Sequence, residues 1–186
     1  MLFELNEVLL QGEPRTLSMM AKEGQLTCLT GDDPARLTRW LLAMLGFVPV
    51  VHGFICIDGE PLTVATAPVF RGLMAYAPSR LKAGGEVKTY EPPSVQDVFN
   101  LKANRERPIS NGILSEEMRR VGASVGKEQA QLLAVAGLLG KPILLADNPP
   151  VEALAYLQRL LQQGTIVIAT SKDGRLLAEA SQVVEV

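Results

Sequence analysis

Residues 125–150 read VGKEQAQLLAVAGLLGKPILLADNPP, and this stretch decides the fold class. Residues 127–139 predict a helix that is apolar on most sides, which is typical of a buried helix. Gly140, Lys141 and Pro142 end that helix, and residues 143–146 predict a strand without a polar side chain. A continuous apolar strand beside a buried helix is typical of a parallel sheet that helices cover on both faces.

The alternation of strands and helices continues on both sides of this stretch. Further strands are predicted at residues 3–10, 25–30, 54–58, 73–77, 165–170 and 183–186. One helix is predicted from apolar residues at helical spacing, which are Leu37, Trp40, Leu41, Met44 and Leu45, and a second is predicted over 150–162. Residues 79–125 are richer in Pro, Gly, Ser and charge, with short helical pieces predicted at 95–102 and 116–120. We therefore expect a single domain over residues 1–186, with residues 79–125 inserted in it.

The composition excludes several classes of protein. The 186 residues include 18 Lys and Arg against 20 Asp and Glu, and only 5% are aromatic. This charge balance excludes an electrostatically driven nucleic-acid binder, and the few aromatic residues argue against base stacking. One His and two Cys exclude most zinc sites and a disulfide framework, so no metal site is predicted and Cys28 and Cys56 are expected to be core thiols. Glu116 and Glu117 are expected on a solvated helical face.

No signal peptide or membrane span is predicted. The first ten residues contain Glu4 and Glu7 and no basic side chain, unlike a signal peptide. Residues 40–57 carry no side chain that is charged at pH 7, but Gly46, Pro49 and Gly53 divide them into a helix end, a turn and a strand start. We expect a soluble, cytoplasmic protein without a direct membrane span.

Six segments in sequence resemble landmarks of the nucleotide-binding domain of ABC transporters, along nearly the whole chain. They are EGQLTCLTG (23–31, the strand entering the phosphate loop), HGFICIDGEPL (52–62, a hairpin), LMAYAPS (73–79, the strand before the Q-loop), SVQDVFNL (94–101, part of the helical subdomain), residues 125–150 (the signature helix and the Walker B strand) and TIVIATS (165–171, the strand before the switch histidine). The resemblance implies an α/β, P-loop NTPase-like fold: a mostly parallel sheet flanked by helices, with N-terminal antiparallel strands and a reduced helical subdomain.

The phosphate loop of that family reads GxxGxGK[ST], and the corresponding residues here are GDDPARLT (31–38). In the family, the glycines let backbone amides wrap the phosphates, and the Lys neutralises phosphate charge. Only Gly31 and Thr38 match the motif. Pro34 and Arg36 replace glycines, and Leu37 replaces the Lys.

The start of the helix that follows this loop has two interpretations. Asp33 before Pro34 predicts a helix N-cap followed by the first helical position. A capping carboxylate would use the amides that otherwise bind an anion, so the anion site would be lost. The alternative is an unusual phosphate site in which Arg36 supplies the missing charge.

The other catalytic positions that the resemblance implies are also replaced. Asn148 stands for the catalytic Glu of Walker B, and an amide cannot accept a proton from attacking water. The further replacements are Ser79 for the Q-loop Gln, Ser171 for the switch His, and Lys127 and Glu128 for the signature glycines. Asp147 matches the Walker B Asp. The resemblance therefore implies no catalytic residue, and it leaves Gly31, Thr38 and Asp147 as vestigial nucleotide-binding residues.

The resemblance leaves three functions open. The first is a non-hydrolytic structural or regulatory subunit of an ABC-type complex, with an ABC membrane subunit, an intact ATPase subunit or a second copy as its partner. Such a subunit would be peripheral at the inner face of the membrane, and residues 79–125, with Val98 and Phe99, would contact the partner. The alternative for Val98 and Phe99 is that they pack the helical subdomain against the core. The second is an ATP-binding subunit with weak ATPase activity, which would use ATP and Mg²⁺. The third is a soluble protein-interaction module unrelated to transport.

Overall fold

The computed structural model describes residues 1–79 and 110–186 of the chain. The helical piece predicted at 95–102, including Val98 and Phe99, lies outside the described residues. Within them, no helix is long and apolar enough to cross a membrane.

The central layer is a parallel sheet, as residues 125–150 predict, and it has five strands within the described residues. Its strands are β3 (Leu26–Thr30), β6 (Met74–Ala77), β7 (Ile143–Ala146), β8 (Ile166–Thr170) and β9 (Gln182–Glu185), in the spatial order β6-β7-β8-β3-β9. All four pairings between neighbours are parallel. The apolar strand predicted at residues 143–146 coincides with β7.

A second, antiparallel sheet contains the N-terminal strands. It consists of β1 (Leu2–Leu10), β2 (Leu17–Lys22), β4 (Val50–Ile57) and β5 (Glu60–Pro61), in the order β2-β1-β4-β5. Strand β2 was not predicted from the sequence, although its buried and exposed residues alternate strictly, with Leu17, Met19 and Ala21 facing the core. Cys28 and Cys56 are free and buried in β3 and β4, so both are core thiols as predicted.

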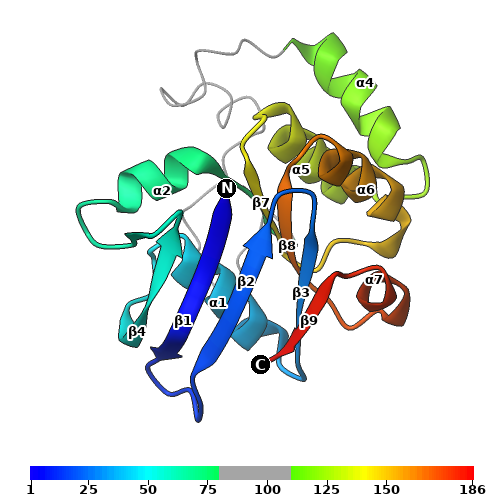
Figure 1. The fold of residues 1–186 in the computed structure, drawn as a ribbon. Helices are drawn as coiled ribbons and strands as arrows, with labels where there is room; N and C mark the ends of the chain where they lie inside the picture. The colour runs from blue at the N-terminus through cyan, green and yellow to red at the C-terminus, as the bar shows by residue number, and fades with distance from the viewer. Residues whose placement is uncertain (80–109) are drawn as a thin grey trace, which may run out of the picture.

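Helices surround the parallel sheet (Figure 1). They are α1 (Pro34–Met44), α2 (Ala67–Leu73), α4 (Asn111–Val121), α5 (Lys127–Leu138), α6 (Leu154–Gln162) and α7 (Gly174–Ala178), with a 3-10 turn at Val151–Ala153. Helix α2 was not predicted from the sequence, and the helix predicted from residue 150 begins with the 3-10 turn. The expected solvated position of Glu117 is wrong, because this side chain of α4 is buried and accepts a hydrogen bond from the Tyr156 hydroxyl at 2.8 Å.

The parallel sheet separates two apolar cores. On one side, Ile143 and Leu145 of β7 pack with α1, α2 and the antiparallel sheet, and Trp40 of α1 is buried there. On the other side, Leu144 and Ala146 pack with α5, α6 and α7. Because successive side chains of a strand point to opposite faces, a strand apolar at every position is what a sheet covered on both faces requires.

Candidate functional site

The carboxyl ends of the parallel strands bring together residues that are far apart in the sequence. In an open α/β sheet, this edge is where ligands bind. Gly31 follows β3, Ser79 follows β6, Asp147 follows β7 and Ser171 follows β8. Backbone hydrogen bonds tie these ends together, since the Asp147 amide donates to the Ala77 carbonyl at 2.9 Å.

Asp147 lies at the centre of a hydrogen-bonded cluster of hydroxyls. Its side chain is buried and accepts from Thr38 Oγ1 at 2.8 Å and Tyr76 Oη at 3.3 Å, both on Oδ2, and from Thr170 Oγ1 at 3.0 Å on Oδ1. Burial, reinforced by the Asp147 charge, raises the pKa of Tyr76, so this hydroxyl stays protonated and donates. Within the described residues, no cationic side chain pairs with Asp147. The carboxylate is therefore held by three neutral donors.

Asn148 and Ser171, the two polar residues beside this cluster, take part in hydrogen bonds that involve the backbone. Asn148 has φ +48°, in the left-handed region that Asn tolerates better than most residues, and its amide donates to Thr170 Oγ1 at 2.8 Å. Ser171 is buried, and its hydroxyl accepts from the Asp173 amide at 3.0 Å, just before α7. Ser79 lines a small cavity of about 10 Å³ with Asp147 and Asn148.

The helix start predicted at Asp33 and Pro34 is confirmed. Helix α1 begins at Pro34, and Asp33 Oδ1 accepts from the Ala35 amide at 2.9 Å. Leu37, which replaces the family's Lys, is buried in the core rather than directed to the loop. The loop therefore presents a carboxylate, and not an ammonium group, at the N-terminal end of α1.

Gly31 is positioned by its contact with β9, not by the Asp147 cluster. A Cβ atom at residue 31 would lie 2.8 Å from the Val186 carbonyl oxygen, closer than real Cβ atoms come. The Val186 amide also donates to the Thr30 carbonyl at 2.8 Å, which holds this close approach. Glycine is thus required here for backbone packing.

Arg36 is paired with an acidic residue that the sequence analysis did not single out. Its Nε lies 2.6 Å and its Nη2 2.5 Å from Glu13 Oε2. Glu13 belongs to the turn between β1 and β2, and its side chain is only 3% exposed. The guanidinium on which the alternative phosphate site depends is therefore already paired with a carboxylate of the protein.

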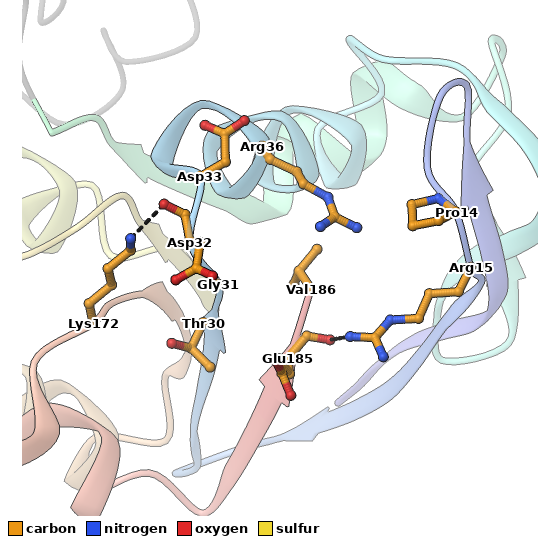
Figure 2. A pocket seen from close by; sticks show the side chains of 10 residues that line it. All are labelled: Pro14, Arg15, Thr30, Gly31, Asp32, Asp33, Arg36, Lys172, Glu185 and Val186. Atoms are coloured by element: carbon orange, nitrogen blue, oxygen red, sulfur yellow. Dashed lines mark hydrogen bonds between the residues drawn. The ribbon is translucent and has the colours of Figure 1, made fainter.

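A cleft of about 670 Å³ opens beside the loop (Figure 2). Figure 2 shows Lys172 and Arg15 on opposite sides of it, each bound to a backbone carbonyl: Lys172 Nζ to Asp32 at 2.5 Å and Arg15 Nη2 to Glu185 at 3.2 Å. The acidic residues Asp32, Asp33 and Glu185 also line the cleft, so both cationic and anionic groups line it.

Of the three predicted site residues, the fold brings Thr38 and Asp147 into direct contact and places Gly31 against β9. Tyr76, Thr170 and Glu13 were not predicted from the sequence. A polar residue at the end of an otherwise apolar strand was a usable signal for Thr170. Neither Tyr76 within β6 nor Glu13 in a turn gave a comparable signal.

The sequence matches no protein-family model and no curated protein. The fold, by contrast, matches solved structures. An ATP-binding subunit of an ABC transporter aligns with TM-score 0.73 and 16% identity, over 100% of this chain and 86% of the other. A putative ABC transporter ATP-binding protein from Pyrococcus furiosus aligns with TM-score 0.74 and 16% identity, over 100% and 97%. A bacterial Atm1-family ABC exporter with ATP bound aligns with TM-score 0.72 and 13% identity, over 100% of this chain and 36% of the exporter.

These matches define the fold as that of the ATP-binding domain of ABC transporters, which confirms the predicted α/β, P-loop NTPase-like class. At 13–16% identity they establish the fold alone.

Proposed function

We propose that this chain is a non-hydrolytic domain of the ABC ATP-binding fold, which acts as a structural or regulatory subunit of an ABC-type complex. The observation that carries the proposal is the Asp33 carboxylate at the start of α1, which accepts from the Ala35 amide where a phosphate would otherwise bind. Gly31, Thr38 and Asp147 are then remnants of a nucleotide site, in a single domain in which residues 79–125 are the inserted helical part.

The loop residues do not fit a triphosphate. Pro34 has no amide hydrogen, and the Ala35 amide donates to Asp33. Two of the first backbone amides of α1 are therefore not available to bind a phosphate. The Asp33 carboxylate lies at the positive end of the helix dipole and would repel phosphate oxygens. Glu13 neutralises Arg36, and Leu37 is in the core.

The chain also offers few oxygen ligands for Mg²⁺ among the residues that the structure describes. Thr38 and Asp147 remain in contact, but Mg²⁺ prefers six oxygen ligands, several of which are waters and substrate phosphates. Within the described ranges, no three His, Cys, Asp or Glu side chains are grouped to hold a metal ion. Asn148 and Ser171 offer neither a base at neutral pH nor an imidazole. These residues therefore do not support a hydrolytic step.

Titration calorimetry with Mg-ATP, together with an assay of phosphate release, tests the proposal. We expect no saturable binding and no release above background in the wild type, and the same result for Asp147→Ala. Steady release at an ordinary rate of about 1–10 s⁻¹, abolished by Asp147→Ala, would contradict the proposal and establish the weak ATPase instead.

The partner is tested separately by co-purification with co-expressed ABC membrane and ATPase subunits. We expect a complex that Val98→Asp and Phe99→Asp disrupt while the melting temperature stays near that of the wild type. Val64, 98% exposed in the described part of the chain, offers a matched control, because Val64→Asp adds the same charge elsewhere. A monomeric chain that retains no ABC subunit would favour an interaction module unrelated to transport.

A further inference from the structure

We propose that Arg36 and Arg39 form an oxyanion-binding site whose resident ligand is the protein's own Glu13, so that the turn between β1 and β2 closes the site against external oxyanions. The inference rests on the proposed function in one respect, that the native cleft holds no triphosphate. It adds which group occupies Arg36 and Arg39 in the native chain, and which ligands could bind these arginines if that group were removed.

The Glu13 carboxylate has the contacts of a bound ligand. Arg36 directs both Nε and Nη2 to Glu13 Oε2, at 2.6 and 2.5 Å. Arg39 Nη1 lies 3.8 Å from the other oxygen, Oε1. The side chain of Glu13 is 3% exposed, whereas those of Arg36 and Arg39 are 29% and 38% exposed. The carboxylate is therefore enclosed, and the two guanidinium groups that hold it remain open to solvent.

The two arginines are suited to oxyanions in general. They stand three residues apart on α1, which places both side chains on one face of the helix. A guanidinium group presents a planar fork of donors that fits carboxylate and phosphate oxygens equally well. Hydrogen bonding to Glu13 raises the pKa of Arg36, and the Asp33 charge adds to this shift, so Arg36 stays charged.

The turn that carries Glu13 is also attached to α1 through its backbone. Arg39 Nη2 donates to the Gln11 carbonyl at 2.6 Å, and the Glu13 amide donates to the Leu10 carbonyl at 3.0 Å. Gly12, between these residues, has φ +84°, a conformation that favours glycine. The turn therefore presents its carboxylate and one carbonyl to the same pair of arginines.

There is room for an external anion on both sides of Arg36. The 670 Å³ cleft of Figure 2 and a second cavity of about 470 Å³ share Pro14, Asp33 and Arg36 as lining residues. In Figure 2 the Arg36 side chain extends from α1 toward Pro14, across the cleft. A ligand that enters either space passes the Asp33 carboxylate and finds the donors of Arg36 occupied by Glu13, so these donors become available once Glu13 is withdrawn.

A tethered carboxylate competes strongly with free anions, because its effective concentration is about millimolar or higher. The test is calorimetry with inorganic pyrophosphate at low ionic strength. We expect undetectable binding to the wild type. We expect binding at least about tenfold tighter to Glu13→Gln, which keeps the shape of the side chain and removes its charge. Adding Arg36→Leu to Glu13→Gln abolishes the gain.

Three outcomes would overturn the inference: a folded Glu13→Gln variant that binds pyrophosphate no better than the wild type, a gain that survives Arg36→Leu, or a wild type that already binds as tightly as the variant. If Glu13→Gln does not fold, Glu13→Asp decides in its place, because its shorter side chain weakens the contact while keeping the charge, and it must then bind pyrophosphate more tightly than the wild type. A negative pyrophosphate result does not change the outcome of the Mg-ATP experiment, so each proposal can be contradicted without the other.

Discussion

Thr38 Oγ1 donates to Asp147 Oδ2 at 2.8 Å, which joins the second turn of α1 to the end of β7 across 109 residues of sequence. Thr170 and Tyr76 donate to the same carboxylate, so among the residues that the structure describes the charge of Asp147 is balanced by hydrogen bonds and not by an ion pair. In this structure, the Thr38–Asp147 pair fastens a helix to the sheet.

We predict that Thr38→Val destabilises the protein by about 1–2 kcal/mol, because it removes a hydrogen bond to a buried charged group. Thr30→Val is the matched control, since it makes the same chemical change at a residue that lines the open cleft. Urea denaturation of both variants measures the difference. Equal stability of the two would show that the Thr38 hydroxyl contributes nothing to holding Asp147.

We predict that Asp33→Ala lowers the free energy of unfolding by roughly 1 kcal/mol, the usual contribution of a helix cap. The reason is the loss of the bond from the Ala35 amide to Asp33 Oδ1. Asp32→Ala is the control, because Asp32 contributes its backbone carbonyl, to Lys172, and that carbonyl remains after the substitution. If thermal denaturation shows an equal loss of stability for both variants, the Asp33 side chain does not stabilise α1 as a cap.

We predict that Leu37→Lys, which restores the residue type of the family's loop, does not restore hydrolysis and costs about 2–4 kcal/mol of stability. Leu37 is 4% exposed within the core formed by α1 and the sheets, so the substitution removes apolar burial and brings an ammonium group to an apolar site. Urea denaturation and phosphate release are measured on the same preparation. A variant as stable as the wild type would mean that this position opens to the loop.

The fold was predictable because its signal is local. An apolar strand flanked by Gly and Pro at residues 140–142, followed by Asp147, indicates a covered parallel strand whatever else the chain contains. The cap at Asp33 was predictable for the same reason. The pairing of Glu13 with Arg36 was not, because it joins a turn to a helix 23 residues away and depends on how the two sheets stack. The burial of Glu117 was not predictable, because charged residues at helical spacing indicate a solvated face. Its buried partner, Tyr156, lies 39 residues away in the sequence.

We predict that stability declines at alkaline pH with a contribution from Cys28. Burial raises the pKa of this thiol from an ordinary value of 9.0 to about 12. The unfolded chain therefore releases a proton that the folded chain retains, and the contribution of Cys28 is lost as pH rises from about 9 toward 12. The slope is about 1.4 kcal/mol per pH unit for one such group.

Urea denaturation at several pH values between 8 and 11 checks this in the wild type and in Cys28→Ala. The variant should show the smaller decline, although Tyr76 and Tyr156, whose pKa values burial also raises, still contribute at the upper end. Parallel curves for the two proteins would show that the Cys28 thiol titrates alike in the folded and unfolded states.

The last prediction concerns the contact that fixes α4 and α6 against α5. A Cβ atom at Gly137 would overlap the hydroxyl oxygen of Tyr156 and lie 3.0 Å from its Cζ. That hydroxyl donates to the buried Glu117 at 2.8 Å. If the Tyr156 side chain moved to avoid the new methyl group, the Glu117 carboxylate would lose this hydrogen bond. We expect Gly137→Ala to cost about 1–3 kcal/mol through overpacking, despite the better helix propensity of Ala.

The double variant separates this cause from a general loss of helix packing. In Tyr156→Phe, the clashing oxygen is absent, so Gly137→Ala should cost at least about 1 kcal/mol less there than in the wild type, which is the coupling expected of residues in contact. Gly72→Ala in α2 is the control, because nothing lies within 4 Å of its added Cβ and the helix should gain up to about 1 kcal/mol. Additive effects of the two substitutions, measured by urea denaturation, would mean that a side chain at residue 137 does not meet the Tyr156 hydroxyl.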